Sequence, residues 1–465
     1  MLRRVLLRAW TAALVCAGVA GLAGGGYPVG PPAGAVWPMR GRDYGMSSFS
    51  PIAGLSPAML GRLRPAWRFV ADGGIPGSPA VDGHTVFIGS SRGTLYALDL
   101  GTGRKRWEVA LGARPQTAYG FPTLGISGTP MLAGDRVYVA TAQTDVVCLD
   151  AATGGFIWRT RVGDPRKGEA IWSAPLVWRD RVYVGIDGVL DEPTVRGRVV
   201  ALDAASGHIV WTYVVPQYAG GGGAGVFGSP ALDPATGTLF VATGNPTPKN
   251  APPPGPDPGS DSILALDAAT GHLRWAFGPT HPHDDQDLDF LGTPNLIARP
   301  DGLAVGAGEK DGVYYVVDAR TGRLVWKTAL SQPGRVAEII GSGAIAFGKI
   351  FLGTQDFPPG VTTFNPDLPG RLVALDAMTG RIAWQLAGPK QILGPPAVSK
   401  EGVVFAADYA GTVWGVNGRT GRSLWRGTLG GFAWKGGVSL APGALLAGAA
   451  APANALVAFG LYPSP

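Results

Sequence analysis

Hydrophobic and polar positions alternate in a pattern that returns about every 50 residues, a period typical of solenoids and propellers. Each copy follows the consensus A-L-D-x-x-T/S-G-x-x-x-W, in which an apolar strand ends at Asp and the next strand carries Trp. The seven copies span residues 97–107, 148–158, 201–211, 265–275, 316–326, 374–384 and 415–425. The chain is therefore expected to be one repeat architecture rather than a set of unrelated domains.

Each copy has the chemistry of a tight hairpin. The Asp side chain can accept hydrogen bonds from the amides two and three residues on, and the Gly can take the positive φ that closes the turn. A second hairpin precedes most copies, as in residues 78–99 and 129–150. Four antiparallel strands per copy, no long helix and one large Trp to pack against the next copy predict the blade of a β-propeller.

The two ends of the chain predict how the ring closes. Residues 436–461 have strand patterns but no terminal Trp, whereas the strand around Trp67 has the Trp but no preceding strands. Joined, they form an eighth blade and leave no free sheet edge. We therefore predict an all-β fold, a single eight-bladed propeller over residues 55–465. An extended segment, residues 27–54, is expected to lie across its surface, and seven blades is the alternative.

The first 26 residues have the features of an export signal. Arg3, Arg4 and Arg8 precede an apolar run over residues 9–23, which glycines then interrupt. The run is short for a spanning helix. We expect cleavage and a periplasmic, cell-envelope or secreted protein, with an uncleaved anchor as the alternative. The formal net charge of +6 falls to +3 without this segment, which argues against nucleic acid as a partner.

Cysteine content limits the redox chemistry of the chain. Its two cysteines are Cys16 and Cys148; the first belongs to the predicted signal, so no internal disulfide is expected. Cys148 stands where other copies carry Ala, which favours a buried packing residue over a reactive thiol. The sequence contains no CxxCH, so it has no haem-attachment site of its own.

One short segment concentrates the acidic residues. Residues 281–290, HPHDDQDLDF, place four carboxylates within six positions, and these repel one another unless water, a cation or a hydrogen-bond network compensates them. The segment is either a solvated loop or a cation site. Leu288 and Phe290, interleaved with the acids, indicate a partly buried strand. His281 and His283 leave zinc as an alternative, although two ligands of four are weak evidence.

Three features together resemble one family. The Trp repeat, the run WPMRGRDYGMSSFSP and the strand RLRPAWRF are similar to those of the eight-bladed quinoprotein alcohol dehydrogenases, which use pyrroloquinoline quinone (PQQ). The resemblance covers nearly all of the chain after the signal. The repeat alone specifies only the fold, because non-catalytic propeller scaffolds are built from similar repeats.

Local matches to this family imply roles for individual residues. Glu192, shortly before the V-R-G of residues 195–197, and Asn245, in the run GNP, resemble two metal ligands. Asp287 resembles the catalytic base and, as an oxygen donor, is also assigned to the metal ion. Lys310 resembles the basic residue that hydrogen-bonds the reactive quinone carbonyl, where it stabilises developing negative charge.

The resemblance also assigns the surroundings of the cofactor, with departures. Phe227 stands where the family commonly has a Trp beneath the quinone, and Trp172 is assigned to cofactor binding as well. The vicinal cysteine pair that covers the cofactor in well-known members is absent. Asp289 matches an additional ligand of lanthanide-dependent relatives, because an extra carboxylate suits a trivalent ion. Calcium is nevertheless the first expectation and a lanthanide ion the alternative.

Two functions from different classes follow. The first is an exported dehydrogenase that oxidises an alcohol with PQQ and a bound metal ion, and passes electrons to an external acceptor such as a cytochrome c. Polyvinyl alcohol dehydrogenases have similar repeats, so a secondary or polymeric alcohol is a candidate substrate beside small primary alcohols. The second is a scaffold that binds protein or envelope polymer, since each candidate residue alone is also typical of a solvated loop or turn.

Overall fold

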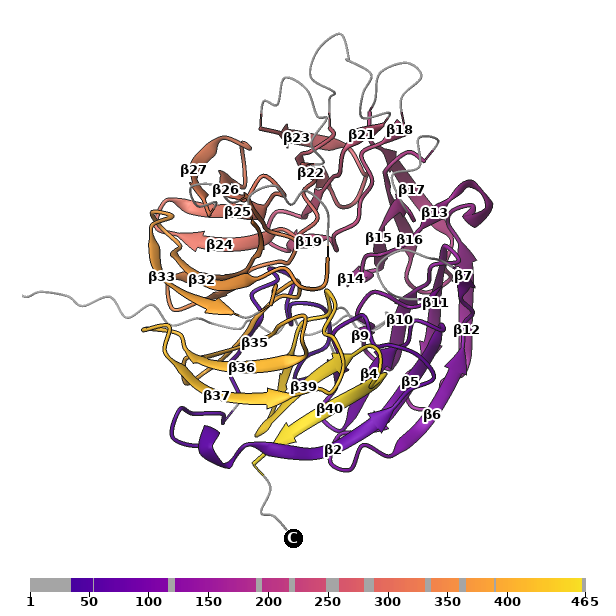
Figure 1. Cartoon of the computed structure of the whole chain (residues 1–465). Coiled ribbons are helices and arrows are strands. Elements are labelled where there is room, and N and C mark those ends of the chain that lie inside the picture. Colours follow the sequence, from indigo (N-terminus) through magenta and orange to yellow (C-terminus); the bar gives the residue numbers. More distant parts are fainter. Residues whose placement is uncertain are drawn as a thin grey trace, which may run out of the picture.

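The computed structural model describes residues 35–52, 54–115, 122–189, 195–216, 222–247, 259–279, 288–330, 336–358, 365–388 and 390–461. Within these ranges, eight antiparallel sheets are arranged as blades around a central axis (Figure 1). The described part of the chain contains no helix long and apolar enough to cross a membrane. The predicted signal lies outside these ranges, so its cleavage and the domain boundaries stay predictions.

Blades 1 to 7 are each built from strands that follow one another along the chain, with the first strand nearest the axis (Figure 1). Their bounds are β3 (Ala80–Val81), β4 (Thr85–Gly89), β5 (Thr94–Asp99) and β6 (Lys105–Ala110); β9 (Met131–Ala133), β10 (Arg136–Ala140), β11 (Asp145–Asp150) and β12 (Phe156–Arg161); β14 (Leu176–Trp178), β15 (Arg181–Gly188), β16 (Arg198–Asp203) and β17 (Ile209–Val214); β19 (Ala231–Asp233), β20 (Thr238–Ala242), β22 (Ile263–Asp267) and β23 (Leu273–Phe277); β24 (Asn295–Arg299), β25 (Gly302–Gly308), β26 (Val313–Asp318) and β27 (Leu324–Ala329); β29 (Ala344–Ala346), β30 (Lys349–Gly353), β32 (Gly370–Asp376) and β33 (Ile382–Gly388); and β34 (Ala397–Ser399), β35 (Val403–Ala407), β36 (Thr412–Asn417) and β37 (Ser423–Thr428).

Blade 8 joins the two ends of the chain. Its strands are β38 (Ser439–Ala441), β39 (Ala444–Ala449), β40 (Ala455–Gly460) and β2 (Arg64–Val70). β2 pairs antiparallel with β40, and Figure 1 draws the indigo strand beside the yellow one. The predicted fold class, eight blades closed by the N- and C-terminal strands, is therefore confirmed.

A few short elements lie outside the blade pattern. They are β1 (Phe49–Ser50), which pairs with β34; β13 (Glu169–Ala170), which pairs with β15; the pairs β7 (Arg114–Pro115) with β8 (Thr123–Leu124), β18 (Gly222–Gly223) with β21 (Pro246–Thr247) and β28 (Val336–Glu338) with β31 (Gln355–Phe357); and the 3-10 helices η1 (Leu60–Arg62) and η2 (Pro165–Lys167).

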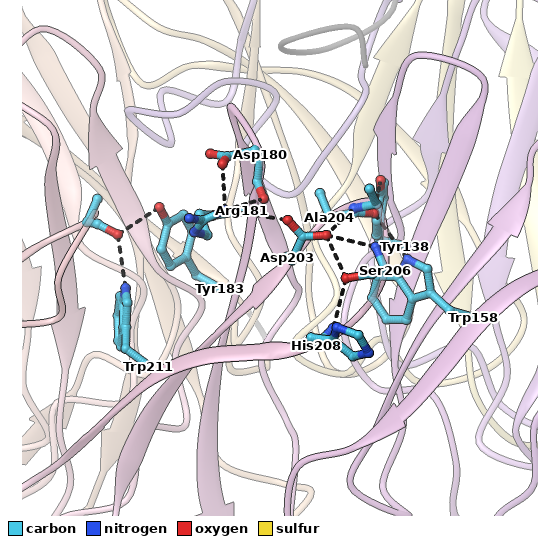
Figure 2. Close-up of polar contacts among 12 residues, drawn as sticks. Tyr138, Trp158, Asp180, Arg181, Tyr183, Asp203, Ala204, Ser206, His208 and Trp211 are labelled. Atoms are coloured by element: carbon cyan, nitrogen blue, oxygen red, sulfur yellow. Dashed lines mark hydrogen bonds and ion pairs between the residues drawn. The ribbon is translucent and has the colours of Figure 1, made fainter. Parts of the chain in front are cut away.

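The repeat motif docks each blade onto its neighbour, as the contact between blades 2 and 3 illustrates (Figure 2). Asp203 Oδ1 accepts hydrogen bonds from the amides of Ala205 (3.1 Å) and Ser206 (2.8 Å), as the sequence predicts. This turn presents the carbonyl of Ala204 to the indole of Trp158 in blade 2, which donates to it at 3.1 Å. The hydroxyl of Tyr138 donates to the same oxygen at 3.1 Å.

The same indole-to-carbonyl bond runs through the complete ring. The pairs are Trp67 with Leu100, Trp107 with Ala151, Trp158 with Ala204, Trp211 with Ala268, Trp275 with Ala319, Trp326 with Ala377, Trp384 with Gly418 and Trp425 with Leu63. The last pair links blade 7 to the chain leading into β2, and the first links β2 to blade 1. Each blade is thus held by its neighbours on both sides.

The glycine of the motif is fixed by this docking, and its replacement is expected to destabilise the protein. Gly207 has φ +74°, and a Cβ there would lie 2.6 Å from the Trp158 ring. For Gly207→Ala we expect the free energy of unfolding to fall by about 3 kcal/mol, from backbone strain and overpacking together. Denaturant unfolding measures this. Gly443→Ala is the control, because Gly443 has φ +64° with nothing within 4 Å; equal losses in both variants would contradict the docking explanation.

The segment before the propeller is buried, which differs from the expectation that it lies across a surface. Residues 36–50 run along the inner strands in blade order, and the side chains of Trp37 and Met39 are 1% exposed. Tyr44 donates through its hydroxyl to the carbonyl of Val177 in blade 3 at 3.0 Å. The backbone bonds of this segment join Trp37 to Val81, Pro38 to Leu132, Tyr44 to Leu232, Gly45 to Leu296, Ser47 to Ile345 and Ser48 to Val398. Residues 36–50, called the hub segment below, therefore contact blades 1 to 7.

Cys148 packs inside blade 2, as predicted. It is completely buried on β11, and desolvation by burial is the main cause that raises the pKa of its thiol to about 11. The thiol is therefore protonated at neutral pH and contributes packing rather than nucleophilic chemistry.

Candidate functional site

A ring of small residues surrounds the axis on one side of the hub segment. In blades 1 to 7, the positions of this ring lie four residues before the inner-strand residues that contact the hub segment. Here the chain passes so close to the next blade that there is room for small residues only. A Cβ on Gly228 would lie 2.9 Å from the carbonyl oxygen of Gly292, and one on Gly394 would lie 2.6 Å from that of Gly436. The eight equivalent positions are Gly77, Gly128, Ser173, Gly228, Gly292, Gly341, Gly394 and Gly436. We call them the small-residue ring.

Hydroxyl groups beside this ring tie neighbouring blades together. Ser229 Oγ accepts from the amide of Ala174 at 2.8 Å, and the amide of Ser229 donates to Thr293 Oγ1 at 3.0 Å. The amide of Thr293 donates in turn to Ser342 Oγ at 2.9 Å. Sequence reasoning missed the ring, although the recurring Gly-Ser/Thr-Pro triplets before the inner strands are its signal.

Trp172 and Phe227, both predicted to bind the cofactor, lie side by side. Each precedes a position of the small-residue ring, in blades 3 and 4 respectively. Their ring centroids are 5.4 Å apart with an interplanar angle of 35°. The indole of Trp172 donates to the carbonyl of Gly188 at 2.8 Å, which fixes its orientation. The two residues form a continuous aromatic surface at the axis.

Three further predicted residues are brought together by blades 4 and 5. Asp289 Oδ2 accepts a hydrogen bond from Lys310 Nζ at 2.6 Å, and Asp289 Oδ1 accepts one from the backbone amide of Asn245 at 2.6 Å. The side chains of Lys310 and Asp289 are 13% and 7% exposed. The backbone amide of Lys310 also donates to the carbonyl of Asp289 at 3.1 Å. Residues from three separate loops thus surround one buried carboxylate.

Two glycines let acidic side chains approach the backbone between these groups. A Cβ on Gly244 would lie 2.5 Å from Asp289 Oδ1, and one on Gly225 would lie 1.6 Å from Asp187 Oδ1. The amide of Gly244 donates to the carbonyl of Gly225 at 2.9 Å. Asp187, near the end of β15, was not singled out from the sequence. It lies beside Gly225, which is two residues before Phe227 and is hydrogen-bonded to Gly244, the glycine beside Asp289.

The remaining candidates lie outside the described residues. These are Glu192 and Asp287, together with His281, His283, Asp284 and Asp285. The first described residues after Glu192 approach the site: the amide of Gly197 donates to Gly223 (2.8 Å), and Gly223 pairs with Pro246, next to Asn245. Within the described ranges, no group of three His, Cys, Asp or Glu side chains is placed to hold a metal ion.

One local expectation for the acidic segment was only partly correct. Phe290 is completely buried, as its position among the acids predicts. Residues 288–291 do not form a strand, however. The amide of Phe290 donates to the carbonyl of Thr243 at 3.3 Å, so the segment is held by the loop after β20 rather than by a sheet ladder.

Two protein-family models match the chain. The model described as outer membrane protein assembly factor BamB matches residues 63–186 and 357–458. The model described as glucose/ethanol/alcohol dehydrogenase, beta-propeller domain, matches residues 161–332. The second range contains every residue predicted for the site.

Curated relatives include several dehydrogenases. The chain is 31% identical to quinohemoprotein alcohol dehydrogenase ADH IIB of Pseudomonas putida, over 63% of this chain and 47% of that protein. It is 25% identical to lanthanide-dependent methanol dehydrogenase of Methylacidiphilum fumariolicum (85% and 80%) and 26% identical to polyvinylalcohol dehydrogenase of a Pseudomonas species (84% and 67%). The chain therefore spans about half the length of the first relative and more of the other two.

Solved structures support the same architecture. A europium-containing methanol dehydrogenase superposes with a TM-score of 0.75 at 22% identity, covering 89% of each chain. BamB from Moraxella catarrhalis superposes with a TM-score of 0.58 at 18% identity, covering 86% of this chain and 99% of that one. At these identities the structures show the fold alone. The sequence relatives, together with the dehydrogenase propeller model over residues 161–332, support the resemblance to the PQQ-dependent quinoprotein alcohol dehydrogenases that the sequence predicts.

Proposed function

We propose that this protein oxidises an alcohol, with PQQ as its cofactor and a metal ion beside it. The observation that carries the proposal is the contact of Asp289 with both Lys310 and Asn245, in the same layer of loops as the paired rings of Trp172 and Phe227. The carboxylate of Asp289 is thus held by the ammonium of Lys310 and by the backbone amide of Asn245, and a carboxylate, an asparagine and a lysine beside one another supply the oxygen ligands and the cationic donor that a metal-bound quinone requires.

The residues present fit a planar, anionic quinone. The adjacent rings of Trp172 and Phe227 offer an aromatic surface on which a flat heterocycle can stack. Lys310 is a buried donor within reach of Asp289, and a lysine in this position can hydrogen-bond a quinone oxygen. Phe227 has less ring area than the tryptophan common in the family, and Trp172 beside it extends the surface.

In this proposal the chain's own residues divide the work. Asp287 accepts the hydroxyl proton of the alcohol. Asn245 and Asp289, with Glu192, hold the metal ion through oxygen atoms. Lys310 donates to the cofactor oxygen on which negative charge develops. When bound, PQQ supplies the acceptor for the two electrons and two protons that an alcohol loses on becoming a carbonyl compound.

Reconstitution tests the proposal. Protein given PQQ with Ca²⁺ or La³⁺ is expected to reduce an artificial electron acceptor when an alcohol is added, and protein lacking PQQ is expected to be inactive. Comparing the two ions tests our proposal that the metal ion is calcium rather than a lanthanide. A higher rate with La³⁺ would assign Asp289 to the binding of a trivalent ion. Failure to bind PQQ with either ion would overturn the function.

Substrate, acceptor and location are further parts of the proposal. We propose a secondary or polymeric alcohol, since a relative is named polyvinylalcohol dehydrogenase, and a separate electron acceptor such as a cytochrome c, since the sequence has no CxxCH. Export is supported by the basic and apolar character of residues 1–26. Rates with polyvinyl alcohol, 2-propanol and methanol distinguish the substrate classes.

A scaffold function is the second candidate. It is favoured by the match of the BamB model to residues 63–186 and 357–458, which lie mostly outside the proposed site. A scaffold predicts no binding of PQQ and no metal-dependent rise in the melting temperature, so the reconstitution experiment separates the two functions.

A further inference from the structure

Lys435 extends across the axis of the propeller. It lies in the turn between β37 in blade 7 and β38 in blade 8, at the position directly before Gly436 of the small-residue ring. Its Nζ is 3.7 Å from the centroid of the Phe227 ring and 4.5 Å from that of the Trp172 ring. Blade 4, which carries Phe227, faces blade 8 across a ring of eight. The side chain therefore crosses the centre and ends on the opposite aromatic surface.

No carboxylate of the described ranges forms an ion pair with the buried ammonium of Lys435. The residue is 8% exposed, and among the described residues its polar contacts are the two aromatic rings. Burial is the main cause that lowers the pKa of Lys435 well below its ordinary value; Arg40 lowers it further, and Asp187 opposes the shift. Holding this charge is unfavourable in the protein without a ligand.

A second cation stands behind Lys435. Arg40 belongs to the hub segment, and its Nε donates to Thr293 Oγ1 at 3.3 Å. Burial lowers the pKa of Arg40 to about 10, although the side chain keeps some accessible surface. Lys435, which contacts the aromatic rings, therefore has a second cation near enough to lower its pKa by repulsion. An anion bound there relieves the repulsion and the desolvation of both.

We propose that Lys435, supported by Arg40, is the cationic part of a site for a planar aromatic carboxylate whose stacking part is Trp172 and Phe227. The inference rests on the proposed function, because PQQ is the aromatic carboxylate that the site takes. It adds an interaction that the family resemblance does not assign: an ammonium from blade 8 on the aromatic surface of blades 3 and 4. A cation against stacked rings strengthens binding of an anion more than binding of a neutral ring.

The same placement affects the redox properties of the bound cofactor. Reduction adds electron density to the quinone, and a nearby positive charge stabilises the electron-rich form more than the oxidised form. Lys435 is therefore expected to raise the reduction potential of the bound cofactor. Its loss shifts that potential to lower values, which spectroelectrochemical titration of the loaded protein measures independently of turnover.

The test is the variant Lys435→Met, which keeps the side-chain length and removes the charge. Equilibrium dialysis is expected to give a Kd for PQQ about tenfold higher than in the wild type. Affinity for 1,10-phenanthroline-5,6-dione, a planar quinone without carboxylates, is expected to stay the same. Without ligand, the melting temperature of the variant is expected to equal or exceed that of the wild type, because a desolvated charge has been removed.

Two controls make the outcome decisive. Lys435→Arg keeps the charge and is expected to retain PQQ affinity. Lys327→Met makes the same substitution on the outer strand β27, where Nζ lies 5.8 Å from the Tyr315 ring but the residue is exposed, and is expected to change nothing. Folded Lys435→Met with wild-type affinity and potential overturns this inference alone, whereas a wild type that does not bind PQQ overturns the proposed function.

Discussion

Replacing Lys310 with methionine is expected to lower the free energy of unfolding of the metal-free protein by about 3 kcal/mol. The reason is the partner that remains. Asp289 has a side chain that is 7% exposed, and the substitution removes the ammonium that lies 2.6 Å from its carboxylate. Removing one member of a buried pair leaves an uncompensated charge, which is far less favourable than the intact pair.

The same variant is expected to respond more strongly to cations. A metal ion bound by Asp289 replaces the lost positive charge, so added La³⁺ or Ca²⁺ should raise the melting temperature of Lys310→Met more than that of the wild type. Differential scanning calorimetry with EDTA and then with each ion measures both effects. Lys310→Arg keeps the charge and is expected to behave like the wild type.

Lys390→Met is the matched control for the loss of an ion pair. Lys390 pairs with Asp367, whose side chain is 86% exposed, so its removal is expected to have little effect on stability. If Lys310→Met melts at the wild-type temperature, or if both respond equally to the ions, Asp289 is not where the cation binds.

The variant Asp287→Ala is expected to lower turnover with PQQ and metal by about a thousandfold. Asp287 is two residues before Asp289 in the sequence, and Asp289 is the carboxylate that contacts Lys310 and Asn245. A base must accept the hydroxyl proton of the alcohol as its electrons leave, and this is the role that we propose for Asp287. Single-turnover reduction of the loaded protein measures the loss directly.

A neighbour in the same acidic run provides the control. Asp285→Ala removes one carboxylate from the same segment and is expected to retain most of the turnover. The melting temperature of both variants should stay within a few degrees of the wild type, because both positions lie in the sequence between β23 and β24 rather than in a blade strand. Equal activity of the two variants would mean that the base lies elsewhere.

The architecture could be predicted because its causes are local. The Asp turn, the glycine with positive φ and the Trp four residues later are all within one hairpin, so each copy carries its own signal. Predicting how the ring closes required one further step. The strand around Trp67 had no preceding strands, the strands of residues 436–461 had no Trp, and the two had to be joined in one blade. The bonds of Trp67 to Leu100 and of Trp425 to Leu63 have the form that this step implies.

The contacts at the axis could not be predicted in the same way, because they join residues far apart in sequence. Lys435 reaches Phe227 only in the closed ring of eight blades. Its place directly before Gly436 predicts a position at the axis only once the small-residue ring is known. The hub segment has no hydrophobic period of its own. It is held by backbone bonds to six blades and by the Tyr44 hydroxyl bond to blade 3, rather than by a sheet of its own. The pairing of Asp289 with Lys310 likewise depends on how two loops of blade 5 fold back.

The position of the hub segment and β2 at the start of the propeller has a consequence for the order of assembly. Residues 36–70 leave the ribosome before any blade exists, yet their partners are distributed from Val81 to Gly460. Blades can stack on one another as they emerge, since each needs only its predecessor. The hub contacts need every blade up to the seventh, and β2 needs the final strand. The part of the propeller that is synthesised first is thus the part whose contacts are completed last.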